Sequence, residues 1–572
     1  MNLLKRNCFF SQCVRFLLSL PAIATPFPRE CHWPGASPSR QTEKKFPYWR
    51  LVMNDKFDFL KNICFLTYSE PSNNKEFKSK EFSMARMKYF ILFVMLLTSC
   101  QLHCETVFAK HMPNKRVGEH IEIGSPALIV QYFIPIPEYE IGDGSREAMI
   151  SMYKKTVRDM YEFGANAVSL DIFDGQRDKT NVVYFIEAVR QFNKENSNAN
   201  FAYFINLDMN FHNINSWPAE SIINTFNLTN GPDYALFNGK PILSTWQGDQ
   251  KGMRFWINEI CTPLKKAGNE PFLYCMFMKY KENNPDIDRM LGYYNEIKKA
   301  GFEIAYYQWA CAESSKTIKE LEMIQQSFSK AGIRATPGFS SSFWATVASG
   351  NASLKPNAGD YKEHFGYEST DKQLRAVLPG GPFEKQTHLW VTIWNDIGED
   401  NCFSPNPNPT RDRKAPEIEV WTHRGFYEYC KRYITWFKNH SEPPITKDMI
   451  FWAYRQHPKD LPTQQGDIIQ PSIKINTSEM IDCVFFSTVL TAPATLKFAL
   501  GNTVYNVNAN AGVQHHRLLW KEGRGFPKFE IVRNGNTIIK ATGTVEITDN
   551  PKGTHGVFTR NFRTYADFAR SE

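Results

Sequence analysis

From residue 127 onward, short apolar runs alternate with longer stretches in which apolar residues recur every three or four positions. A short apolar run is typical of a strand buried in a parallel sheet, and the helical period is typical of a helix that covers such a sheet. The pattern predicts strands at 127–133, 166–171, 201–208, 241–246, 271–278, 302–309, 333–339 and 388–394.

The stretches between these runs carry helix signals at their ends. Ser145 is a predicted N-cap for a helix that stops at Gly164, and Asn284 with Pro285 opens another that stops at Gly301. Further helices are expected at 315–330 and 424–439. Eight strand–helix units predict an α/β fold, a (β/α)8 TIM barrel, which we place at residues 105–462.

After Pro443 and Pro444 the pattern changes to short alternating segments at 473–475, 483–486, 495–499, 512–518, 529–532 and 544–547. Asn534-Gly535 is a strong hairpin signal between two of them. We therefore predict a β-sandwich at residues 463–572. It would either bind carbohydrate or only stabilise the barrel, and the absence of clustered aromatic residues favours the second role.

The first 104 residues differ in composition from the rest. They carry 15 of the 67 basic and 7 of the 59 acidic residues, so the formal charge of +8 lies there and the remainder is neutral. Residues 105–572 have no net positive charge with which to bind a phosphate backbone, so we exclude nucleic acid as a partner. None of the six cysteines after residue 104 has C-x-x-C spacing, so neither a metal nor another cofactor is expected.

Residues 84–104 have a basic start, an apolar centre and a small, polar exit, which is typical of a signal peptide and too short for a membrane span. We expect a protein that is secreted and leaves no membrane segment after cleavage, with translation starting at Met84 or Met87. Residues 1–83 would then be a gene-model extension or a disordered segment. A lipobox-like interpretation of 97–100 is the weaker alternative. Four N-x-S/T sequons, at Asn227, Asn351, Asn439 and Asn476, fit a secretory protein.

In a TIM barrel the active site lies at the carboxyl ends of the strands. Carboxylates, amides and tryptophans follow the predicted strands there, and these groups suit a carbohydrate because indole faces stack on sugar rings and polar groups bind hydroxyls. The candidates are Asp171, Asp174, Asp208, Trp246, Gln308, Trp309, Trp344, Trp394, Asn395, Asp396 and Glu399. For Asp396 and Glu399 a solvated turn is the simpler explanation when that stretch is taken alone.

The sequence lacks the motifs of nucleotide-binding enzymes, zinc proteases and serine hydrolases. No dinucleotide or phosphate-binding glycine pattern follows a strand, no H-E-x-x-H occurs, and Ser340 to Ser342 lack the flanking glycines of a nucleophile elbow.

Several segments, in order, resemble glycoside hydrolase family 71, the endo-α-1,3-glucanases or mutanases. They are VFAKHM at 107–112, FINLDM at 204–209, GKPILSTW at 239–246, TIWNDIGE at 392–399, PITKD at 444–448 and YRQHP at 454–458. The sequence departs from the family pattern at Asp400 to Cys402, at Asp171, where Asn is expected, and in an insertion at 134–145.

The resemblance implies a polysaccharide hydrolase that inverts anomeric configuration, with Asp396 and Glu399 as the catalytic pair. A third essential carboxylate would be Asp171 or Asp174, with Asp208 nearby. In an inverting enzyme one carboxyl protonates the leaving oxygen and a carboxylate activates water; we assign these roles to Glu399 and Asp396. The alternatives are a glycosidase of another α-glucan or of a mannose-containing glycan, and a non-catalytic carbohydrate-binding barrel.

Overall fold

The computed structural model describes residues 120–572 except 135–143, 211–213, 278–279, 282–283, 311–313, 342, 346–358, 363–365, 397–400, 406–421, 460–463, 466–467, 470–474, 477–480, 521–522 and 550–563. The expected extension, signal peptide and opening family segment therefore lie outside the described residues.

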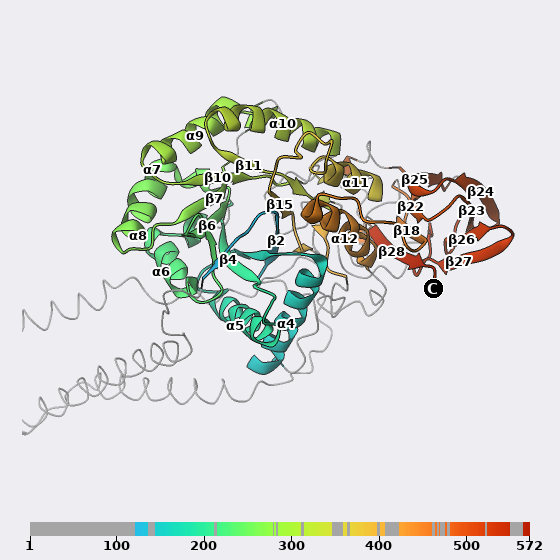
Figure 1. The fold of residues 1–572 in the computed structure, drawn as a ribbon, viewed down its shortest axis with the longest axis horizontal. Coiled ribbons are helices and arrows are strands. Elements are labelled where there is room, and N and C mark those ends of the chain that lie inside the picture. The colour runs from blue at the N-terminus through green and yellow to red at the C-terminus, as the bar shows by residue number, and fades with distance from the viewer. Residues whose placement is uncertain are drawn as a thin grey trace, which may run out of the picture. The chain divides into compact units, whose positions relative to one another are not determined.

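A closed ring of parallel strands forms the centre of the larger domain (Figure 1). The strands are β2 (Ala127–Phe133), β3 (Ala167–Ile172), β4 (Ala202–Asp208), β6 (Lys240–Trp246), β7 (Phe272–Met276), β10 (Ile304–Tyr307), β11 (Arg334–Thr336), β12 (Gly338–Phe339) and β15 (His388–Val391). Each pairs in parallel with the next, and β15 returns to β2. The seventh position is split at Pro337, so that β11 pairs with β10 and β12 with β15. The predicted barrel is confirmed.

Helices follow the strands and surround the ring (Figure 1). They are α4 (Arg146–Phe163), α5 (Lys179–Glu195), α6 (Ala219–Thr229), α7 (Met253–Phe255), the π-helical η3 (Trp256–Cys261), α8 (Thr262–Lys266), α9 (Ile287–Lys299), α10 (Ser314–Lys330), α11 (Tyr367–Arg375) and α12 (Arg424–Asn439). Two 3-10 turns, η1 (Ile214–Ser216) and η2 (Gly248–Lys251), lie in the loops.

The helix ends follow the capping rules where the sequence carries them. Ser145 accepts a hydrogen bond from Ala148 N, and Gly164 ends α4 at a φ of 106°. The expected start of α9 at Asn284-Pro285 is wrong, because these residues form β9 (Asn284–Pro285) with β8 (Tyr280–Lys281). Asp286 caps α9 instead by accepting from Arg289 N.

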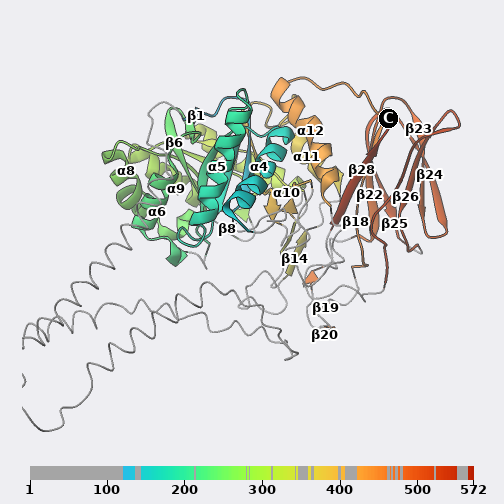
Figure 2. The ribbon, with the colours of Figure 1, turned by 90° about the horizontal axis from the view of Figure 1, so that it is seen from below.

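The C-terminal domain consists of two four-stranded antiparallel sheets that lie face to face (Figure 2). One contains β18 (Met449–Arg455), β22 (Cys483–Leu490), β25 (Gly512–Leu519) and β28 (Thr564–Arg570), and the other contains β23 (Ala494–Leu500), β24 (Thr503–Ala509), β26 (Lys528–Arg533) and β27 (Asn536–Thr542). Their facing side chains form one core, in which Trp452 stacks on Phe529 at 4.8 Å between ring centroids. This is the predicted β-sandwich.

Three details of the sandwich differ from, or bear on, the sequence predictions. β18 belongs to it, although it precedes the boundary expected at residue 462. Residues 544–547 do not form a strand, since only Ile547 makes an isolated bridge, to Gly525. The Asn534-Gly535 turn is confirmed: both residues have positive φ, 54° and 81°, as a type I′ hairpin requires.

Short strands complete the described residues. β1 (Ile121–Glu122) and β5 (Ala235–Phe237) extend the barrel sheet at β6. β13 (Phe343–Ala345), β14 (Gly359–Lys362) and β21 (Ile475–Asn476) form a separate sheet, as do β16 (Asn395–Asp396) with β17 (Asn401–Cys402) and β19 (Gln464–Gln465) with β20 (Ile468–Ile469).

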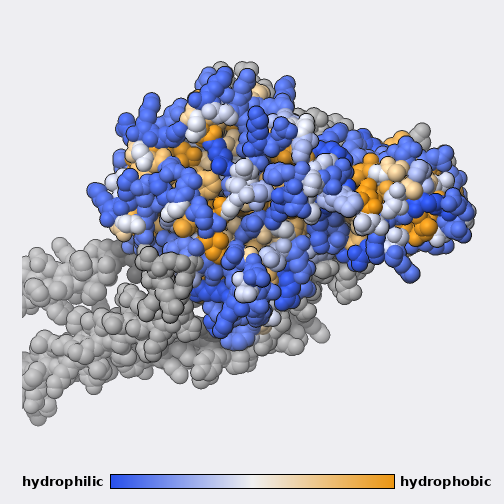
Figure 3. Space-filling view, viewed as in Figure 1, coloured by the Kyte–Doolittle hydropathy of each residue, from blue (hydrophilic) through white to orange (hydrophobic). Residues whose placement is uncertain are grey.

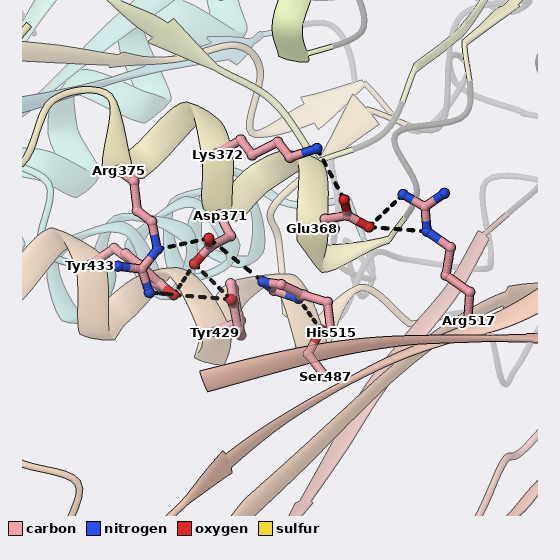
Figure 4. A network of polar contacts seen from close by, with 9 residues as sticks. All are labelled: Glu368, Asp371, Lys372, Arg375, Tyr429, Tyr433, Ser487, His515 and Arg517. Carbon is pink, nitrogen blue, oxygen red and sulfur yellow. Dashed lines mark hydrogen bonds and ion pairs between the residues drawn. The ribbon is translucent and has the colours of Figure 1, made fainter. Parts of the chain in front are cut away.

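The sandwich packs on the last two barrel helices through apolar and polar contacts. Phe451, Ala453 and Ala566 belong to the same apolar cluster as Tyr367 and Tyr429. A polar network lies beside them, built from side chains of α11, α12 and the sandwich strands β22 and β25 (Figure 4).

The face seen in Figure 3 is largely hydrophilic, and the large exposed apolar side chains among the described residues of the sandwich are Val504, Leu519 and Phe526. Five buried cysteines among the described residues are free, namely Cys261, Cys275, Cys402, Cys430 and Cys483. No helix within the described ranges has the length and hydropathy needed to cross a membrane.

Candidate active site

The register of the barrel strands places the candidate residues at two levels near their carboxyl ends. Phe133, Asp171, Asn206 and Ser244 are paired in sequence around the ring and form one level. Asp208 is paired with Trp246 one level higher, two residues beyond Asn206. Because strand neighbours two residues apart point to the same side of a sheet, Asp208 and Asn206 project from the same face of β4.

Asp171 is enclosed in this arrangement, with 1% of its surface exposed. Its Oδ2 accepts a hydrogen bond of 2.5 Å from Gln131 Nε2. Burial raises the pKa of the Asp171 carboxyl well above its ordinary value, and the nearby Asp208 raises it further, while the amides of Gln131 and Asn206 oppose the shift. Asp171 takes part in no ion pair among the described residues, so the neutral acid is the favoured form.

Asp208 is also buried, at 4% exposure, but its surroundings are more polar. It accepts hydrogen bonds from the backbone N of Asn210 at 2.9 Å and from the Asn210 side chain at 3.4 Å. Its backbone carbonyl accepts the indole N–H of Trp217 at 3.0 Å, which fixes the end of β4.

Asp174, the alternative to Asp171, lies in the turn after β3. Its Oδ1 accepts from the backbone N of Gln176 and of Arg177, at 2.8 and 3.1 Å. Asp178 holds the same turn by accepting from the backbone N of Phe173 and Asp174. Asp174 thus stabilises a loop through backbone contacts, whereas Asp171 lies within the strand-end cluster.

Asp396 is positioned beside the end of β2 by its neighbour Asn395. The Asn395 side chain accepts from Phe133 N at 2.8 Å and donates to Phe133 O at 3.0 Å, which ties β16 to β2. Asp396 is 5% exposed and pairs with Asn401 in the β16–β17 hairpin. Asp171 and Asp208 thus lie on the neighbouring ring strands β3 and β4, and the hairpin that carries Asp396 is tied to β2, which is the next strand of the ring. Glu399 lies outside the described residues.

Two tryptophans of the candidate set lie together. The rings of Trp246, at the end of β6, and Trp309, after β10, have centroids 5.4 Å apart and are both partly exposed. Partly exposed indole faces at a barrel rim are suited to stacking on a sugar ring. Trp344 lies in β13, opposite Tyr361.

Gln308, Trp394 and Asn395 make structural contacts instead. The Gln308 amide donates to Thr317 O at 2.8 Å and accepts from Gly338 N at 3.3 Å. Trp394 is fully buried against Phe163 of α4 and Tyr427 of α12. The polar atoms of Asn395 bind the Phe133 backbone. All three candidates therefore stabilise the structure around the site through contacts within the protein.

The structure adds residues that the sequence analysis missed. Gln131 bonds both Asp171 and the indole of Trp390, and Tyr307 donates to Asn206 Oδ1 at 3.3 Å while stacking on Trp390. Polar residues inside otherwise apolar strands, such as Gln131 in ALIVQYF, were the available signal.

The same site segment is where the chain matches a known family model. Residues 384–567, which include β15, Asn395 and Asp396, match the model described as glycosyl hydrolase family 71. Over this segment the chain is similar to glycosyl hydrolase family 71.

A curated relative carries the corresponding name. A mutanase from Penicillium rubens is 27% identical over 164 residues, which is 28% of this chain and 36% of that protein. The match therefore spans about a third of the relative's length.

Among solved structures, the GH99 endo-alpha-mannosidase of Bacteroides thetaiotaomicron aligns at 10% identity and a TM-score of 0.39, covering 56% of this chain and 99% of that one. A chain described as a glycoside hydrolase-like protein aligns at 11% identity and a TM-score of 0.37, covering 59% and 99%.

No group of three or more His, Cys, Asp or Glu side chains in the described part of the chain is arranged to hold a metal ion.

Proposed function

We propose that this chain is a secreted glycoside hydrolase that cleaves α-1,3-glucan with inversion of configuration. The observation that carries the proposal is the rim of the barrel: Asp171 and Asp208 lie near the carboxyl ends of the neighbouring strands β3 and β4, Trp246 is paired with Asp208 and contacts Trp309, and Asn395 ties the hairpin of Asp396 to β2. The family 71 segment contains Asp396, and the mutanase name of the relative supports a glucan substrate.

The sugar would be held by stacking and by polar contacts. Trp246 and Trp309 are partly exposed aromatic side chains against which a sugar ring would stack, and the Asp208 carboxylate would accept hydrogen bonds from sugar hydroxyls. Hydroxyl recognition by a buried carboxylate gives strong selectivity, because a substrate without that hydroxyl leaves the carboxylate unpaired.

Hydrolysis would use the two carboxyl groups after β15. In this proposal Glu399 donates a proton to the glycosidic oxygen as the bond to the anomeric carbon breaks. Asp396 takes a proton from the water that attacks that carbon from the opposite face. One water is consumed, and the product has inverted anomeric configuration.

The test is a reducing-sugar assay on the full chain with α-1,3-glucan, α-1,4-glucan, α-1,6-glucan and a mannose-containing glycan. Asp396→Asn and Glu399→Gln should each lower turnover by at least about 100-fold while leaving the thermal transition in place. Hydrolysis only of a glucan with another linkage, or only of the mannose-containing glycan, would replace the substrate assignment. Binding without hydrolysis by the unmodified chain would overturn the enzymatic proposal.

Secretion is tested separately. Expression of the full sequence in a eukaryotic secretory host, followed by N-terminal sequencing of protein from the medium, should place the mature start close after residue 104. Retention of residues 1–83 in the recovered protein would contradict that part of the proposal.

A further inference from the structure

Gln131 is held in one orientation by the indole of Trp390. The Trp390 Nε1–H donates to Gln131 Oε1 at 3.1 Å, and both side chains are fully buried. An indole N–H only donates, so the amide oxygen must face Trp390 and the amide NH2 must face the other way. The indole itself is fixed, because it stacks on Tyr307 with ring centroids 4.0 Å apart and an interplanar angle of 10°.

The orientation of the Gln131 amide determines which oxygen of Asp171 accepts a hydrogen bond. Gln131 Nε2 donates to Asp171 Oδ2 at 2.5 Å, so Oδ2 acts as an acceptor. The other oxygen, Oδ1, is buried, and no donor among the described residues meets it in hydrogen-bonding geometry; the Asn206 amide influences the carboxyl less than Gln131 does. If Asp171 carries a proton, that proton belongs on Oδ1.

The surroundings favour a protonated Asp171. The carboxyl is 1% exposed and has no cationic partner among the described side chains, while Asp208 lies one level above it in the barrel. A carboxylate is costly to bury without a cation, and two neighbouring carboxyl groups avoid ionising together. A neutral Asp171 leaves Asp208 free to remain charged.

We propose that Gln131 is a positioning residue of the candidate active site: held by Trp390, it fixes Oδ2 of Asp171 as an acceptor and places the Asp171 proton on Oδ1. Asp171 then serves as a neutral hydrogen-bond donor beside the Asp208 carboxylate. This role deepens the proposed glycosidase function and rests on it for its catalytic consequence. The placement of the proton does not depend on substrate.

The proton placement is tested by infrared spectroscopy of the full chain, without substrate. A protonated carboxylic acid has a carbonyl stretch that moves to lower frequency when the carbonyl oxygen accepts a hydrogen bond. The unmodified chain should show such a band, and Asp171→Asn should remove it. Gln131→Met, which keeps the side-chain length but removes the donor, should move the band to higher frequency. Trp390→Phe should broaden it, because the amide can then turn over.

The catalytic consequence is tested by the pH dependence of kcat/KM on the glucan that the unmodified chain hydrolyses. Gln131→Met should lower kcat/KM by roughly 10- to 100-fold, because the hydrogen-bond geometry of the site is lost. Its alkaline limb should also move to higher pH, since the Gln131 amide favours the charged form of Asp171. Gln373→Met is the matched control: Gln373 is another buried glutamine whose amide binds a backbone group, Ser340 N at 2.9 Å.

The proposed function and the positioning role fail in different ways. If the unmodified chain hydrolyses no glycan, the proposed function fails, and the infrared band still decides where the proton lies. If the chain is active but Gln131→Met leaves both the band and the pH profile unchanged, the positioning role is overturned. The positioning role is overturned as well if Gln373→Met shifts the pH profile as much as Gln131→Met does.

Discussion

Asp371 of α11 is the centre of the polar network between barrel and sandwich, and its removal gives the sharpest stability prediction (Figure 4). Its carboxylate accepts from Arg375 Nε at 2.8 Å, from Tyr429 OH at 3.1 Å and from Tyr433 OH. The His515 ring of β25 lies 3.6 Å away and is held by Ser487 at 2.8 Å.

Asp371→Asn should reduce the free energy of unfolding by about 2 kcal/mol at neutral pH. Hydrogen bonds to a buried charged group contribute about 1.5–3 kcal/mol each, and the amide keeps some of them. The ion pair with Arg375 adds little, because that side chain is 44% exposed. In a folded unit of this size the loss corresponds to roughly 2–3 °C in the transition temperature.

The effect should depend on pH. Burial alone would raise the pKa of Asp371, but the contacts with His515 and Tyr433 and the charge of Arg375 outweigh it and lower the pKa. A carboxyl whose folded-state pKa is lowered stabilises the fold above its unfolded pKa, and that stability is lost as pH falls through the folded value. The difference between Asp371→Asn and the unmodified chain should therefore be fully present at about pH 5 and shrink below about pH 4.

The assay is thermal unfolding followed by circular dichroism across this pH range. Glu368→Gln is the matched control on the same helix, since Glu368 pairs with Lys372 and Arg517, which are 49% and 38% exposed, and should cost less than about 1 kcal/mol. A loss for Asp371→Asn that stays constant down to pH 3, or one no larger than that of Glu368→Gln, would refute the reasoning.

Three further predictions concern single contacts. Asn395→Ala should destabilise the fold by about 2–3 kcal/mol in denaturant titrations, because both hydrogen bonds to the Phe133 backbone are lost; an unchanged midpoint would contradict this. Trp309→Ala should raise KM roughly ten-fold with a smaller change in kcat, as measured in steady-state kinetics, and a loss confined to kcat would argue against a stacking role. Gly425→Ala should cost more than about 3 kcal/mol, because a Cβ there would lie 2.8 Å from the Asp567 backbone; native-like melting of that variant would show that α12 and β28 can separate freely.

The barrel could be predicted from the sequence because its strands are short, mainly apolar runs separated by stretches with a helical period. Residues 127–133 and 424–439 were predicted with the bounds that the structure has. The split of the seventh strand at Pro337 depends on which neighbour each half pairs with, and that is a property of the closed ring.

The strands of the sandwich were harder to predict where strand pairing, and not the local pattern of apolar and polar residues, determines the structure. Met449–Arg455 is an apolar run like a barrel strand, and only its pairing with β22 and β28 assigns it to the sandwich. Thr503–Ala509 was missed because it contains two Asn residues, which are depleted in strands.

For the site, the sequence could supply residue types but not the direction of their side chains. Asn395 and Gln308 looked like rim amides, yet their partners lie 262 and 30 residues away in the chain and are backbone groups. Gln131 could be noticed as a single polar residue in an apolar strand, but the sequence does not identify the carboxyl that it meets 40 residues later.

The most direct measurement of the central claim is proton NMR of the first sugar released from α-1,3-glucan by the full chain, recorded before the anomers equilibrate. The account predicts a β-anomeric signal from the unmodified chain and no sugar from Asp396→Asn or Glu399→Gln. An α-anomeric first product, or near-normal release of sugar by either variant, would contradict it.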